Sequence, residues 1–122
     1  MGFITFDALC RPVTQIPPNG DTCFVEDLTL AVSRAAGTAV IVAAKRGLKA
    51  RAVGGVSYDD MGDWMLMKLA KFGIDTSLMV RCDGFTTSSS LVTARHKSVL
   101  RLIWFTGSNA KRNMPSAGNV LV

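Results

Sequence analysis

The stretch Arg51-Ala-Val-Gly-Gly-Val-Ser-Tyr-Asp-Asp-Met-Gly62 decides the fold, together with the helical segment that follows it as far as Gly73. Residues 49–53 predict a buried strand, and Gly54-Gly55 predicts the turn that ends it. Three aspartates between positions 59 and 63 then predict the start of a helix, because carboxylates stabilise the positive end of the helix dipole. A strand, a turn and a helix in this order form one unit of an α/β sheet.

Two helices are predicted from residue spacing. Residues 35–46 are rich in alanine and end in basic residues before Gly47, as helix C-termini commonly do. The β-branched run 40–42 lowers helix propensity there, so only tertiary burial favours helix. After residue 59, apolar side chains recur at three- and four-residue steps and predict one buried helix face: Met61, Trp64, Met65, Leu69 and Phe72.

The strands complete an α/β order. Residues 2–6 predict a strand that ends at Asp7, and residues 78–80 predict another. Segments 22–24 and 28–32 are expected to pair as a short sheet, and 86–94 with 98–105 as a hairpin. The chain is therefore an α/β protein, in which a parallel sheet with flanking helices carries a separate, small antiparallel lid.

Composition excludes several classes of protein. With 122 residues and 48% hydrophobic residues, the chain is expected to form one folded domain and not a disordered segment. No apolar run approaches the roughly 18 residues of a membrane span. The net charge of +5 comes from scattered basic residues, which argues against a nucleic-acid-binding face. Three scattered cysteines predict reduced thiols in the cytoplasm, and the single histidine argues against a metal site.

Seven motifs in order resemble the N-terminal part of ribokinase-like (PfkB) carbohydrate kinases. Each motif is weak alone, but together they extend from Gly2 to Asn109. They are Gly2-Phe-Ile-Thr-Phe-Asp7, Pro17-Pro-Asn-Gly20, Ala35-Ala-Gly-Thr-Ala-Val40, Val53-Gly-Gly-Val-Ser-Tyr-Asp-Asp-Met-Gly62, Phe72-Gly-Ile-Asp-Thr-Ser77, Thr87-Ser88 and Gly107-Ser-Asn109.

The resemblance implies a partial ribokinase-like domain over residues 1–110, with lid strands within about 12–33 and 86–106, and an irregular tail over 111–122. Full-length members use ATP and Mg²⁺. Their catalytic Gly-x-Gly-Asp motif lies far toward the C-terminus, and no segment here resembles it. We therefore expect no catalytic, cofactor-binding or metal-binding residues in this chain, and neither ATP nor Mg²⁺ bound by the chain alone.

The resemblance also implies which residues bind a sugar or sugar acid: Asp7, Ser33, Arg34, Gly37 and Asn109. Asp7 would accept hydrogen bonds from sugar hydroxyls, although an ordinary strand-end aspartate explains it equally well. Arg34 could bind a carboxylate or phosphate, or lie in solvent. Asn109 could contact substrate or cap a turn. Asp59 and Asp60 are explained better by helix capping than by catalysis.

Several residues depart from the family pattern. Val32-Ser33 stands at the family's glycine pair, with Arg34 next, and Gly37 replaces a common asparagine. Ser57 stands where the family prefers glycine. Ser98-Val-Leu100 replaces a Gly-x-Arg of the lid hairpin, so an anchor for substrate is missing. These departures predict substrate binding that differs from the family's ordinary mode.

Three functions are weighed. The first is the substrate-binding and lid portion of an ATP-dependent sugar kinase, inactive as this chain alone. The second is a non-catalytic remnant that forms a homodimer or another complex through the lid, since unpaired strand edges invite pairing. The third, a basic nucleic-acid-binding module, fits the scattered charge poorly.

Overall fold

The computed structural model describes residues 3–14, 21–95 and 98–105. Eight elements follow one another along the chain. They are β1 (Thr5–Arg11), β2 (Asp27–Ser33), α1 (Arg34–Lys45), β3 (Arg51–Ser57), α2 (Asp60–Lys71), β4 (Asp75–Cys82), β5 (Ser89–Arg95) and β6 (Ser98–Phe105).

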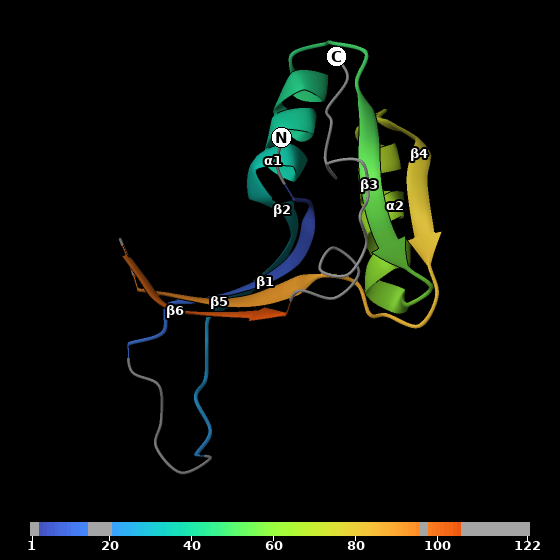
Figure 1. The fold of residues 1–122 in the computed structure, drawn as a ribbon. Coiled ribbons are helices and arrows are strands. Elements are labelled where there is room, and N and C mark those ends of the chain that lie inside the picture. The colour runs from blue at the N-terminus through green and yellow to red at the C-terminus, as the bar shows by residue number, and fades with distance from the viewer. Residues whose placement is uncertain (1–2, 15–20, 96–97, 106–122) are drawn as a thin grey trace.

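These elements form two groups, which we call the lid and the body (Figure 1). The lid is a four-stranded sheet of order β2-β1-β5-β6, and the body holds α1, α2 and the two-stranded parallel sheet β3-β4. Figure 1 shows the lid lying across one end of the body. The predicted α/β class, with parallel strands, helices and a lid, is confirmed. The lid differs from the expected antiparallel sheet because β1 and β5 pair in parallel.

The first strand is longer than predicted, and its partner is different. β1 continues to Arg11, so Asp7 lies inside the strand and not at its end. β2 pairs with β1 along its whole length, from Thr5 opposite Ser33 to Arg11 opposite Asp27. The predicted strand at 22–24 is wrong, because the described residues 21–25 form no strand. Phe24 is 91% exposed there, so local β propensity has no packing surface to support it.

α1 confirms the predicted helix, and burial explains the helical conformation of Val40, one of its β-branched residues. Val40 is only 1% exposed and packs in the core. Gly37 allows the helix to lie close to β2, because a Cβ there would stand 3.2 Å from Val32 Cγ1 and 3.3 Å from Ile4 Cγ1. Helix propensity is therefore outweighed by tertiary packing at this position.

The predicted turn at Gly54-Gly55 is wrong, because both glycines lie buried inside β3. A Cβ on Gly54 would stand 3.2 Å from Ile4 Cγ2 and 3.5 Å from Met79 Sδ. The glycine is thus needed for close packing across the strand and not for a turn. The chain instead leaves β3 at Tyr58 and enters α2 at Asp59, its N-cap residue.

The core lies where α1 and α2 meet the β3-β4 sheet. Met65 and Leu69 of α2 are fully buried, as the predicted helix face requires. The ring of Trp64 meets that of Phe6 edge to face, at 5.2 Å between centroids, which ties α2 to the first lid strand. Within the described residues, neither helix has the length and hydropathy needed to cross a bilayer.

Candidate functional site

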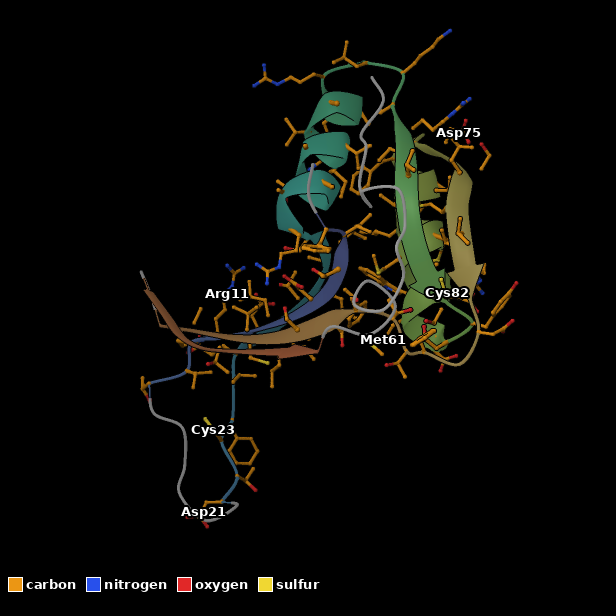
Figure 2. The ribbon with its side chains drawn as sticks, viewed as in Figure 1. Arg11, Asp21, Cys23, Met61, Asp75 and Cys82 are labelled. Carbon is orange, nitrogen blue, oxygen red and sulfur yellow. The ribbon has the colours of Figure 1, made fainter. Side chains whose placement is uncertain are left out.

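The lid has one polar face, which strand register defines. Side chains directly opposite one another in a sheet share a face, as do alternate residues along a strand. The polar face therefore holds Thr5, Asp7, Arg11, Asp27, Thr29, Ser33 and Ser90. Figure 2 shows Arg11 on the side of the lid that faces α1. This face, turned toward the body, is the candidate site.

Asp7 lies near the middle of the polar face and is partly buried. Its Oδ1 accepts hydrogen bonds from Thr5 Oγ1 at 2.9 Å and from Ser90 Oγ at 2.7 Å. Among the described residues, both of these bonds fall on Oδ1, and Oδ2 accepts none. A carboxylate with one oxygen held by the protein and the other available suits the binding of a ligand hydroxyl.

Ser33 and Arg34 lie at the junction of β2 and α1. Ser33 is the N-cap residue of α1, but its side chain makes no capping hydrogen bond, and it lies opposite Thr5 on the polar face. Arg34 has a φ of +68°, a left-handed conformation that favours glycine. The glycine-like backbone position is therefore Arg34. Val32, which stands at the family's glycine pair together with Ser33, is a buried residue of β2.

The other two predicted site residues are placed differently. Gly37 lies in α1 and faces Val32 and Ile4, so its surroundings are those of a packing residue. Asn109 lies outside the described residues, as do the predicted tail and the side chains of Ser98-Val-Leu100. The structure thus brings Asp7 and Ser33 to one face and places Arg34 beside them in the chain.

A second polar cluster joins the body to the lid. The Asp59 carboxylate caps α2 by accepting from Gly62 N at 2.8 Å. The same carboxylate accepts from Thr87 Oγ1 at 2.5 Å and from Thr87 N at 2.7 Å. Thr87 Oγ1 in turn accepts from Ser57 N at 3.0 Å. The sequence predicted that Asp59 caps α2 but not its hydrogen bonds with Thr87. The two residues are 28 positions apart, and local residue spacing carries no signal for such a contact.

The surroundings of Asp59 in the folded protein stabilise the ionised form of its carboxyl group. Burial raises the pKa of its carboxyl, but the hydrogen bonds from Thr87 and Gly62, with the nearby Arg81, outweigh burial and hold the pKa below its usual range. A lowered pKa in the folded state means that Asp59 stabilises the protein above about pH 4. That contribution is lost as the pH falls through the lowered pKa, when the carboxyl is protonated.

Gly62 packs tightly against this cluster and leaves no room for a side chain. A Cβ on Gly62 would stand 2.4 Å from the Ser57 carbonyl oxygen and 3.0 Å from Thr87 Oγ1. Ser57, the last residue of β3, is fully buried and approaches through its backbone. The first turn of α2 therefore lies directly against the end of β3. Among the residues that the structure describes, no three His, Cys, Asp or Glu side chains gather as a metal site.

Comparison with known proteins gives the fold. No family model matches the sequence, and neither does any curated protein. Solved structures do match. The ribokinase from Cryptococcus neoformans var. grubii serotype A, in complex with ADP, has a TM-score of 0.70 at 19% identity, over 93% of this chain and 36% of its own. The body and lid therefore form a ribokinase-like fold.

Two further kinases support the same fold. Arabidopsis thaliana ribokinase, complexed with ribose and ATP, matches with a TM-score of 0.71 at 16% identity, over 87% of this chain and 34% of its own. Thermotoga maritima ribokinase matches with a TM-score of 0.64 at 23% identity, over 90% and 36%. The resemblance inferred from sequence is thus confirmed for the fold, and the chain spans about a third of the length of the kinases it matches.

Proposed function

We propose that this chain forms the sugar-binding and lid portion of an ATP-dependent kinase that transfers phosphate to a carbohydrate hydroxyl. The observation that carries the proposal is Asp7, held through Oδ1 by two hydroxyls on the polar face of a ribokinase-like lid. Its Oδ2 would accept a hydrogen bond from the sugar. Kinases of the same fold have been solved with ribose and ATP or with ADP, which supports this ligand class.

The chain's own part in the reaction would be binding and orientation. Phosphoryl transfer requires the acceptor hydroxyl to lie in line with the transferred phosphate, and much of its rate comes from such positioning. Asp7 and Ser33 would orient hydroxyls, and the guanidinium of Arg34 would donate to the carboxylate of a sugar acid. ATP and Mg²⁺ would supply the phosphoryl group and its charge neutralisation. We assign neither to residues of this chain, and we do not expect the chain alone to turn over.

The remaining predicted residues have narrower roles. Gly37 would contribute by keeping α1 close to β2, because its position is packed against Val32 and Ile4. A role for Asn109 stays a prediction from the sequence, as does a cytoplasmic location inferred from the cysteine pattern. Binding of nucleic acid is not part of the proposal.

Replacing Asp7 tests the proposal. Asp7→Ala should weaken ribose binding at least tenfold, because a hydrogen bond to a charged group contributes about 1.5–3 kcal/mol. Asp60→Asn is the control, since Asp60 is an exposed carboxylate on α2 and not a residue of the polar face, and it should bind as the wild type does. Calorimetric titration with ribose, glucose and gluconate measures the affinities and compares neutral with acidic sugars.

Two results would contradict the proposal. If the wild type binds none of these sugars at millimolar concentration, or if Asp7→Ala binds them unchanged, the polar face is not a sugar site. A separate assay with ATP, Mg²⁺ and sugar should detect no transfer by the purified chain. Phosphorylation in that assay would refute the statement that this portion lacks turnover.

A homodimer through the lid is the proposed assembly, and the non-catalytic remnant remains the alternative function. Beyond Phe6 and Val32, which pack on the body, the face of the lid opposite Asp7 is apolar and open: Leu28 is 61% exposed, and Leu30 and Leu91 are also exposed. Soluble monomers seldom leave a large contiguous apolar patch uncovered. A second copy that presents the same face would cover it symmetrically.

Charge on this face should abolish the dimer. We expect Leu28→Glu to give a monomer by sedimentation velocity at concentrations where the wild type is dimeric, because pairing would bury two unpaired carboxylates. Leu48→Glu is the control, since Leu48 is 51% exposed in the body and should leave assembly unchanged. A wild type that sediments only as a monomer, or a dimeric Leu28→Glu, would rule out the lid as the interface.

A further inference from the structure

The polar cluster at Asp59 is placed where the chain passes from the body into the lid. Figure 2 shows Met61, at the start of α2, and Cys82, the last residue of β4, at the same end of the body. From Cys82 the chain runs through Thr87 into β5, an inner strand of the lid. Asp59 accepts both the backbone N–H and the hydroxyl of Thr87, at 2.7 and 2.5 Å. The segment that leads into β5 is therefore hydrogen-bonded to the N-terminus of α2.

A short series of contacts leads from Thr87 to Asp7. The carbonyl of Ser88, the next residue, accepts from Phe6 N at 3.0 Å, which aligns β5 with β1. Two residues further, Ser90 Oγ donates to Asp7 Oδ1 at 2.7 Å. Thr87 and Ser88 are each 1% exposed, so the segment is enclosed as well as hydrogen-bonded. Displacement of Thr87 would consequently move the hydroxyl that holds Asp7.

We infer that Asp59 is a positioning residue for the Asp7 site, acting through Thr87 and the start of β5. The inference rests on the proposed sugar site for its functional meaning, but not for the anchor itself. The Asp59–Thr87 bonds and the Phe6–Trp64 ring pair are two of the contacts that join lid and body near Asp7, and Ser57 N adds a third by donating to Thr87 Oγ1. The first controls the β5 side of Asp7, and the second controls the β1 side.

Asparagine at position 59 separates the two roles of the carboxylate. Asn and Asp are comparable N-cap residues, so Asp59→Asn can still accept from Gly62 N and begin α2. Its amide has a single acceptor oxygen, however, and its nitrogen only donates. The variant cannot accept from Gly62 N with one atom and from Thr87 N with the other, as the carboxylate does.

The experiment uses the whole chain and measures two quantities in each variant: the hydrogen-exchange rate of backbone amides by NMR, and the affinity for ribose. The diagnostic amide is Phe6 N, bonded to Ser88 O, and the reference amide is Asp75 N, bonded to Ala50 O within the body. The variants are Asp59→Asn, Thr87→Val and Thr87→Ser, with Asp60→Asn as the charge-matched control. Thr87→Ser retains the hydroxyl and serves as the conservative rescue.

We expect Asp59→Asn and Thr87→Val to accelerate exchange at Phe6 by tenfold or more, with exchange at Asp75 changed by less than threefold. Ribose affinity should fall by a similar factor, while Thr87→Ser and Asp60→Asn resemble the wild type. Unchanged exchange at Phe6, or equal acceleration at both amides, would overturn the anchor. Faster exchange at Phe6 with unchanged ribose affinity would overturn the positioning role.

The two proposals can fail separately. If the wild type binds no sugar, the proposed function fails, and the positioning of a sugar site fails with it. The exchange rates at Phe6 and Asp75 then still decide whether Asp59 anchors the lid. If the wild type binds sugar and Asp7→Ala abolishes binding, but Asp59→Asn alters neither exchange nor affinity, only the inference about Asp59 is lost.

Discussion

Gly62→Ala is expected to destabilise the protein by about 3 kcal/mol, a large part of the total stability of a small domain. The new Cβ would stand 2.4 Å from the Ser57 carbonyl oxygen, which belongs to the backbone and cannot rotate away. Relief requires α2 to move from the end of β3. That movement would also stretch the bond from Gly62 N to Asp59, so packing and helix capping are lost together.

The control for Gly62→Ala is a glycine with a left-handed backbone at which an added Cβ would contact no other atom. Gly47 has a φ of +83° and nothing within 4 Å of an added Cβ. Gly47→Ala should therefore cost only about 1–2 kcal/mol, from the left-handed backbone alone. Urea denaturation followed by circular dichroism measures both changes. Equal midpoints for the two variants would mean that the first turn of α2 shifts easily and that the contact with Ser57 is not restrictive.

Leu69→Ala is expected to lower the free energy of unfolding by about 3 kcal/mol. Leu69 is fully buried in the core, where α2 packs against the sheet and α1. Removing its terminal carbons leaves a cavity that cannot fully collapse, because Met65 and Val56 around it are also completely buried. Lost hydrophobic transfer and the cavity both contribute to the effect.

Met67→Ala is the matched control on the same helix. Met67 is 43% exposed, so its truncation should change the free energy of unfolding by less than about 1 kcal/mol. The same urea titration compares the two variants. A Leu69→Ala protein as stable as Met67→Ala would show that the core between α2 and the sheet is loosely packed.

The local features of this protein were predictable because each depends on residues a few positions apart. The helix face of Met65 and Leu69 follows from three- and four-residue spacing, and Asp59 as N-cap follows from its position before α2. The hairpin of β5 and β6 follows from two β-rich segments joined by a short connection. The α/β class was inferred from these units in their order, and the ribokinase-like fold from the resemblance of seven sequence motifs to that family.

The errors arose where distant segments meet. Gly54 was expected in a turn, but Ile4 and Met79 approach it across the sheet, and only a strand without a side chain admits them. Asp7 was expected at a strand end, but β2 extends pairing along β1 to Arg11. The family's glycine pair was aligned with Val32-Ser33, but the positive φ lies at the next residue, Arg34. None of these outcomes depends on local propensity.

For this chain, the amino-acid order by itself determined the helices, their ends and the kind of fold, because hydrophobic periodicity and capping act within about one helical turn. Only the tertiary structure decided how the lid is paired and what holds Asp7. Ser90 lies 83 residues from Asp7, and Thr87 lies 28 residues from Asp59. Contacts over such separations form only when the parallel pairing of β1 with β5 brings the strands together, which local sequence does not encode.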